Sequence, residues 1–159
     1  IDARFDRMIE EGAIEEVRNI SMNLRPTTLD DLGILPTIAW FMREYSSTYQ
    51  HITVEKNITV DEEDVPNELK TVIFRIMQEA MNNIAKHAGA TRIEVSLSRS
   101  GRFLLLEVAD NGRGFSEASA DGGIGLETMR ERAELIGGSC RVESEVNRGT
   151  KVSVEVPAS

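Results

Sequence analysis

The hydrophobic periodicity of this chain changes near residue 50, and that change limits the folds open to it. Before that point, apolar residues recur every three or four positions, as on an amphipathic helix. After it, Ile52, Val54, Ile58 and Val60 alternate with polar residues, which is typical of a half-buried strand. Both patterns recur later in the chain, so we expect a helical layer packed on a sheet.

The pattern predicts helices over residues 2–24, 33–49, 66–88 and 126–136. It predicts a strand from Ile52 and further strands over residues 93–97, 103–109, 140–146 and 151–156. Short turns at Ser100-Gly101 and at Asn147-Arg148-Gly149 join four of these strands into two hairpins, so part of the sheet is antiparallel. Because helices and strands do not alternate strictly, we expect an α+β two-layer sandwich.

The composition excludes several classes of function. With 27 Asp and Glu against 18 Lys and Arg, the formal net charge is −9, which argues against a protein that coats nucleic acid. A phosphorylated small molecule stays possible, because a pocket can be locally positive. A single cysteine and two histidines offer no structural zinc cluster and fit a reducing, cytoplasmic setting. The chain has no apolar run near the ~18 residues of a membrane span, so no membrane contact is expected.

Three polar side chains share one face of the helix predicted over residues 66–88. At 100° per residue, Asn83 lies about 40° to one side of Glu79 and Lys86 about 20° to the other. An Asn amide oxygen suits Mg²⁺, which takes its other ligands from water and phosphates. Glu79 could orient or deprotonate a water, and Lys86 could offset phosphate charge. Taken alone, however, this face is more often an ordinary solvated one.

Two glycine-containing segments could bind the other parts of a nucleotide. Asp110-Asn111-Gly112-Arg113-Gly114-Phe115 follows an apolar strand, and its carboxylate, which only accepts hydrogen bonds, could select the exocyclic amine of adenine. Gly122-Gly123-Ile124-Gly125-Leu126 opens the last predicted helix, where backbone N–H groups favour phosphate. Taken alone, the first segment is more often an ordinary turn, and the second is more often a flexible connection.

The order of these motifs carries more weight than any one of them. The order E-x-x-x-N-x-x-K-H, D-x-G-x-G, G-x-G-L and finally Gly149-Thr150 resembles the ATP-binding domain of sensor histidine kinases. That domain belongs to a superfamily shared with gyrase, Hsp90 and the mismatch-repair ATPases. Residues 74–88 resemble its N box, residues 110–115 its G1 box and residues 123–126 its G2 box. The resemblance covers about residues 52–157 and implies the Bergerat-type ATP-binding fold, with a mixed sheet and a helical segment before it.

The resemblance implies a role for each matching residue, with ATP and Mg²⁺ as cofactors. Asn83 would ligate Mg²⁺, Lys86 would face the phosphates and His87 would border the nucleotide. Asp110 would bind the adenine amine. Glu79, which activates water in hydrolysing members of the superfamily, would be the catalytic carboxylate and in a kinase would mainly tune the metal site. The remaining cofactor-binding positions are Gly112 and Gly114 beside the base, Gly123, Gly125 and Leu126 in the phosphate-side lid, and Thr150 near the adenine-binding Asp.

A narrower resemblance concerns partners. Two parts of the chain resemble the subfamily that pairs with helix-turn-helix response regulators. The first is Leu24-Arg25-Pro26 with residues 29–33, and the second is residues 129–133 with Gly137-Gly138. Residues 1–24 would then be the second helix of the dimerisation and phosphotransfer hairpin, residues 25–50 a connecting helical segment, and residues 51–159 the ATP-binding catalytic domain. The implied partners are a response regulator receiver domain and a second copy of the chain, which would form a homodimer through the hairpin.

Neither of the two histidines matches the phosphoacceptor histidine of this subfamily. In this subfamily the phosphoacceptor histidine precedes Asp or Glu on the first hairpin helix, whereas His51 precedes Ile52 and His87 precedes Ala88. We therefore expect this chain to be a piece of a longer protein. It would bind Mg-ATP and donate the γ-phosphate to a histidine that lies outside the chain, for relay to an Asp of a response regulator. The chain by itself is not expected to autophosphorylate. The alternatives are an ATP-hydrolysing clamp ATPase and a non-catalytic nucleotide-sensing module.

Overall fold

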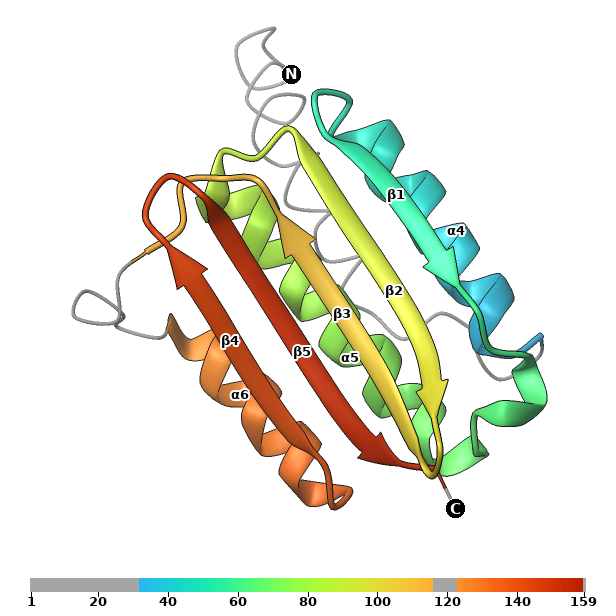
Figure 1. The fold of residues 1–159 in the computed structure, drawn as a ribbon. Coiled ribbons are helices and arrows are strands. Elements are labelled where there is room, and N and C mark those ends of the chain that lie inside the picture. Colours follow the sequence, from blue (N-terminus) through green and yellow to red (C-terminus); the bar gives the residue numbers. More distant parts are fainter. Residues whose placement is uncertain (1–31, 116–122, 159) are drawn as a thin grey trace, which may run out of the picture.

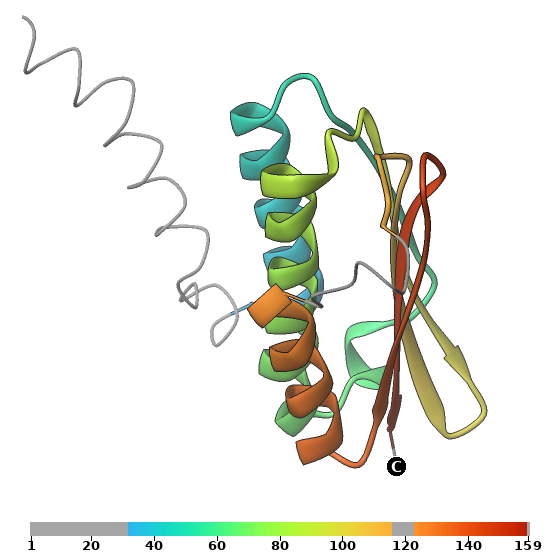
Figure 2. The same cartoon turned by 90° about the vertical axis from the view of Figure 1, so that its left-hand side faces the viewer.

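The computed structural model describes residues 32–115 and 123–158, in which helices cover one face of a sheet (Figure 1). The elements follow the order α4 (Ile34–Thr48), β1 (Thr53–Ile58), a 3₁₀ turn (Glu62–Asp64), α5 (Asn67–Asn83), a π turn (Ile84–Ala88), β2 (Arg92–Ser100), β3 (Phe103–Asp110), α6 (Gly123–Leu135), β4 (Ser139–Glu145) and β5 (Gly149–Pro157). Seen edge-on in Figure 2, α4, α5 and α6 all lie on the same side of the sheet. The predicted α+β two-layer sandwich is therefore confirmed. The helix predicted over residues 2–24 lies outside the described residues.

The sheet of the described residues is mixed, as predicted. Its five strands follow the order β1-β2-β3-β5-β4. β1 pairs with β2 in parallel, and α5 makes the crossover that a parallel pair requires. The other pairs are antiparallel, and the β4–β5 hairpin places β5 between β3 and β4. This order brings the end of β3 and the start of β5 side by side.

The core lies between the sheet and the helices. Alternate residues of the three central strands are buried, and they are Ile93, Val95 and Leu97 on β2, Leu104, Leu106 and Val108 on β3, and Val152, Val154 and Val156 on β5. On the helical side, the rings of Phe41 and Phe74 meet edge to face with centroids 5.7 Å apart, which joins α4 to α5. The strict alternation in these strands is the pattern of a sheet with one face covered.

The long helix predicted over residues 66–88 differs from the observed one at its end. The α-helix ends at Asn83 and the chain continues as the wider π turn, which Gly89 closes in the left-handed conformation at φ 61°. The buried Tyr45 hydroxyl of α4 donates a hydrogen bond of 2.8 Å to the Met81 carbonyl, one turn before the change. Burial raises the pKa of Tyr45, so this hydroxyl keeps its proton. A side chain that binds a helix carbonyl competes with the regular backbone ladder, which favours the wider turn.

The start of α4 is capped by a residue far along the sequence. Glu62, in the 3₁₀ turn, accepts hydrogen bonds from the backbone N–H groups of Ile34 at 3.1 Å and Leu35 at 3.2 Å. Its carboxylate also lies 3.5 Å from the ammonium group of Lys70, in α5. One carboxylate therefore joins the first turns of two helices.

The capping carboxylate predicts a stability effect. Replacing Glu62 by Ala leaves two N–H groups of α4 without their partner, so we expect the free energy of unfolding to fall by about 1–2 kcal/mol. Urea denaturation measures this change. The neighbouring Glu63 is exposed, and Glu63→Ala is expected to stay within about 0.5 kcal/mol of the parent chain. Equal losses in the two variants would contradict the capping role.

A second prediction concerns Gly149, where β5 begins. Its φ is 101°, and a Cβ added there would overlap the backbone carbonyl of Asp110 at the end of β3. Gly101, in the β2–β3 turn, has a φ of 60° and open space around it. We expect Gly101→Ala to lower the free energy of unfolding by about 1–2 kcal/mol through backbone strain alone. Gly149→Ala adds steric overlap and is expected to cost about 2–5 kcal/mol. Urea denaturation measures both changes. Equal decreases of the urea midpoint in Gly101→Ala and Gly149→Ala would refute the close approach of β3 and β5 at Gly149.

Candidate functional site

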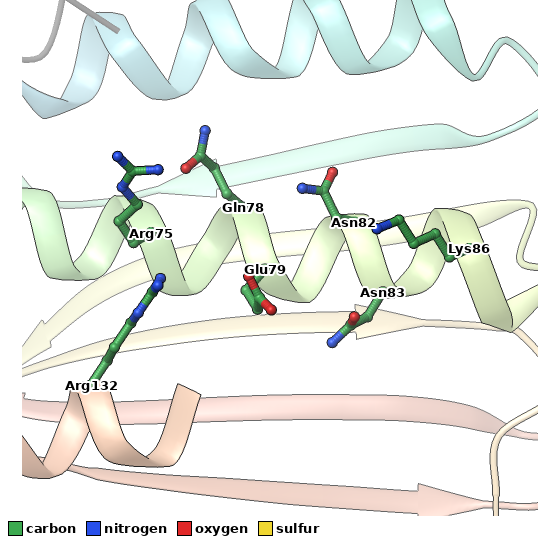
Figure 3. Close-up of a pocket in the computed structure, with 7 residues that line it drawn as sticks. All are labelled: Arg75, Gln78, Glu79, Asn82, Asn83, Lys86 and Arg132. Carbon is green, nitrogen blue, oxygen red and sulfur yellow. The ribbon is translucent and has the colours of Figure 1, made fainter. Parts of the chain in front are cut away.

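A pocket of about 230 Å³ lies along α5 and the π turn (Figure 3). It is lined by Arg75, Gln78, Glu79, Asn82, Asn83, Lys86 and Arg132. The face predicted from the helical spacing is thus present, because Glu79, Asn83 and Lys86 all line this one pocket. The lining holds one carboxylate against three cationic side chains, which makes the pocket locally positive in a chain of net charge −9.

The pocket also contains residues that were not predicted as part of the site. Figure 3 shows Gln78 and Asn82 pointing toward α4, while Arg132 extends from α6 toward α5 on the side of Glu79 and Asn83. Gln78 and Asn82 lie one residue before Glu79 and Asn83, so a wider helical face would have included them. Arg132 comes from a different helix, and only the packing of α6 beside α5 brings it here.

Asp110 ends β3, as predicted, and its carboxylate is half-buried. Burial raises the pKa of Asp110, and hydrogen bonds from the backbone N–H groups of Gly112 and Thr150 oppose that rise. The bond from Gly112 to Oδ1 measures 2.7 Å. A carboxylate has about four acceptor positions, so Asp110 keeps acceptors for a further donor.

The loop after β3 is held by backbone contacts on two sides. The N–H of Arg113 donates to the Ala88 carbonyl of the π turn at 2.8 Å, and the Arg113 carbonyl accepts from the N–H of Asn147 in the β4–β5 turn at 2.8 Å. A Cβ at Gly112 would overlap the Ala88 carbonyl, and one at Gly114 would overlap the carbonyl of Glu145. Close backbone packing therefore requires glycine at these two predicted site positions. This packing could not be predicted from the sequence.

Thr150 lies beside the Asp110 loop, as expected, and shares a hydrogen bond with a residue that was not predicted. Its Oγ1 lies 2.8 Å from the Ser144 Oγ on β4. Ser144 also accepts a hydrogen bond of 2.8 Å from the Phe115 N–H. The sequence did contain a signal for Ser144, because Cys140, Val142 and Ser144 alternate on the half-buried face of β4, where a polar residue is unusual.

The other predicted residues occupy these positions. His87 and Lys86 lie in the π turn and are both exposed residues, while His51 is exposed just before β1. Helix α6 begins at Gly123, earlier than predicted, so Gly123 and Gly125 belong to its first turn, and Leu126 is half-buried. The segment 116–122, in the predicted lid loop, lies outside the described residues. Across residues 32–115 and 123–158, no helix is long and apolar enough to cross a membrane.

Comparison with known proteins connects this arrangement to a family. The family described as "Histidine kinase-, DNA gyrase B-, and HSP90-like ATPase" matches residues 68–159. The "Oxygen sensor histidine kinase NreB" of Staphylococcus carnosus is 39% identical over 147 residues, which are 91% of this chain and 42% of that protein. The chain thus spans less than half the length of this relative.

Solved structures show the same fold. The histidine kinase domain of the Erythrobacter litoralis EL346 blue-light activated histidine kinase gives a TM-score of 0.62 at 24% identity, over 76% of this chain and 60% of that one. Acinetobacter baumannii histidine kinase AdeS gives 0.65 at 10% identity, over 99% of this chain and 86% of that one. The family match covers more than half of the sequence and includes the pocket, the Asp110 loop and α6. The chain therefore belongs to the histidine kinase-, DNA gyrase B- and HSP90-like ATPase family.

Proposed function

We propose that this chain is the ATP-binding catalytic domain of a sensor histidine kinase. It binds Mg-ATP and donates the γ-phosphate to a histidine on a helical hairpin, for relay to an Asp of a response regulator receiver domain. One observation carries the proposal. The π turn contributes Lys86 to the cation-lined pocket and, through the Ala88 carbonyl, holds the loop that follows Asp110. This arrangement supports a phosphate-binding region and an acceptor for a base on two sides of one turn.

The base end is built around Asp110. Its carboxylate can only accept hydrogen bonds, and it keeps acceptor positions beyond those used by Gly112 and Thr150. Such a group matches the exocyclic amine of adenine and opposes a base that presents a carbonyl at the same position. This chemistry supports ATP as the nucleotide.

The phosphate end has ligands that suit Mg²⁺. The Asn83 amide oxygen and the Glu79 carboxylate are hard oxygen donors one helical turn apart on the pocket wall. Mg²⁺ held here would neutralise phosphate charge, with its other ligands coming from phosphate and water. Lys86 and Arg132 add positive charge, and the first turn of α6, with Gly123 and Gly125, presents backbone N–H groups that favour phosphate. The site thus works by positioning and charge stabilisation.

The acceptor histidine is proposed to lie on a separate helix. His51 precedes a strand and His87 lies in the π turn beside Lys86, so neither occupies a hairpin helix. We assign residues 1–24 to the second hairpin helix, residues 25–50 to a connecting segment and residues 51–159 to the ATP-binding domain. The same proposal includes a homodimer through the hairpin, a helix-turn-helix response regulator as partner and a cytoplasmic location.

The adenine contact predicts the effect of one amide substitution. In Asp110→Asn one carboxylate oxygen becomes an NH₂ group, which donates hydrogen bonds where the carboxylate accepted them, and the remaining oxygen keeps the backbone N–H of Gly112 as its donor. We expect the affinity for Mg-ATP to fall about 10- to 100-fold, because a buried donor is left unsatisfied. Isothermal titration calorimetry measures the affinity. Glu107→Gln changes another half-buried carboxylate of the same strand, which pairs with Lys151, and is expected to leave the affinity unchanged. An unaltered affinity in Asp110→Asn would refute the adenine assignment.

A phosphate-transfer assay distinguishes a histidine kinase from an ATP-hydrolysing enzyme. The distinction is needed because Glu79 in the pocket could also support ATP hydrolysis. Labelled Mg-ATP is mixed with this chain and a separately supplied helical hairpin that carries an acceptor histidine. We expect acid-labile label on the hairpin and none on the chain itself, because His51 and His87 lie outside a hairpin helix. A hairpin with glutamine in place of the acceptor histidine is the control. Steady release of inorganic phosphate without labelled histidine would instead support a hydrolysing clamp ATPase.

A further inference from the structure

The last turn of α5 receives a hydrogen bond from the neighbouring helix α4. Tyr45, near the end of α4, is fully buried, and its hydroxyl donates to the Met81 carbonyl at 2.8 Å. Met81 lies two residues before Asn83, the proposed Mg²⁺ ligand, and five residues before Lys86. This bond between helices therefore ends less than two turns from both of these phosphate-end residues.

The Met81 carbonyl has both of its acceptor positions in use. A backbone carbonyl oxygen has two lone pairs. One accepts from the Tyr45 hydroxyl, and the other faces the Ile84 N–H, which Met81 shares with the Ala80 carbonyl. In a regular α-helix the Met81 oxygen would instead accept from the N–H of Ala85. That bond is disfavoured here, and the chain continues as the π turn.

The π turn determines where the Lys86 side chain lies. It closes its backbone bonds over five residues instead of four, so it rotates by less than the about 100° per residue of an α-helix. Residues in this turn therefore point in other directions than they would on a regular helix. Figure 3 shows Lys86 extending back along α5 toward Asn82, on the pocket wall that also includes Asn83.

We propose that Tyr45 is a positioning residue whose hydroxyl holds the π turn in the form that directs Lys86 to the phosphates of the nucleotide. Burial raises the pKa of Tyr45, so the hydroxyl keeps its proton and remains a donor. The inference rests on the proposed binding of Mg-ATP, and it adds a determinant of phosphate affinity from α4. The loop after Asp110 is held separately, by its backbone bond to the β4–β5 turn, so the base end is expected to stay intact.

The test compares a ligand that has phosphates with one that has none. Affinities for Mg-ATP and for adenosine are measured by NMR titration for the parent chain and for Tyr45→Phe, which keeps the ring beside Phe41. The Mg-ATP affinity divided by the adenosine affinity reports what the phosphate end contributes, because a general loss of fold lowers both alike. We expect this ratio to fall about fivefold in Tyr45→Phe, the effect of one hydrogen bond, with adenosine affinity unchanged.

Thr37→Val is the matched control. Thr37 is also a fully buried residue of α4 with a hydroxyl that donates to a backbone carbonyl, but its acceptor is Gly33 at the start of the same helix, at 2.7 Å. Its removal weakens α4 without removing a bond to α5. We expect a lower urea midpoint and an unchanged affinity ratio.

A double-mutant cycle tests whether Tyr45 acts through Lys86. In the parent chain, Lys86→Ala is expected to lower the Mg-ATP affinity about tenfold, as for a hydrogen bond to a charged group. In the Tyr45→Phe background the lysine is already displaced, so the same substitution is expected to cost only about twofold. Losses that depend on one another in this way identify a shared interaction.

Failure of the inference is distinguishable from failure of the proposed function. An unchanged ratio in Tyr45→Phe, an equal fall of both affinities, or an equal fall of the ratio in Thr37→Val would overturn the positioning role. Independent losses in the double variant would overturn it as well, because Tyr45 would not act through Lys86. A parent chain that does not bind Mg-ATP would overturn the proposed function itself.

Discussion

The candidate site depends on one backbone contact, the hydrogen bond from the Arg113 N–H to the Ala88 carbonyl. It joins the loop after β3, which belongs to the sheet, to the π turn, which belongs to the helical layer. Gly112 allows the approach because a side chain there would meet the same carbonyl. The core already holds the two layers together, and this contact adds a direct link between the loop that follows Asp110 and the turn that carries Lys86.

The wider turn at the end of α5 gives this contact its position. Ala88 is the last residue of the π turn, so its carbonyl has no later helical N–H to bind and accepts from the N–H of Arg113 in the loop. π turns are frequently found at functional sites. Here the turn contains Lys86 and His87, which the resemblance places beside the phosphates and the nucleotide.

Much of this arrangement could be predicted from the sequence, for reasons that differ between elements. The strands of the sheet were predictable because each buries one face, so that Leu104, Leu106 and Val108 alternate with less buried residues. The shared face of Glu79, Asn83 and Lys86 followed from helical spacing alone. The site's amide and carboxylate residues were recognisable because their motifs occur in a fixed order along the chain.

What could not be predicted depends on contacts between distant segments. The hydrogen bond from Tyr45 to Met81, just before the π turn, joins two residues that are 36 positions apart in the sequence. Arg132 enters the pocket because α6 packs beside α5, and the contacts of Ser144 exist because β4 and β5 pair next to the loop after β3. Local periodicity contains none of this information.

The two polar bonds of α4 have a mechanical consequence. At its start, Glu62 binds the first N–H groups of α4 and lies beside Lys70 of α5, and near its end Tyr45 is bonded to Met81. Polar bonds at both ends of α4 therefore oppose sliding of this helix along α5. Because Met81 lies in the last turn of α5, two residues before Asn83, the position of α4 is coupled to the end of α5 that lines the pocket.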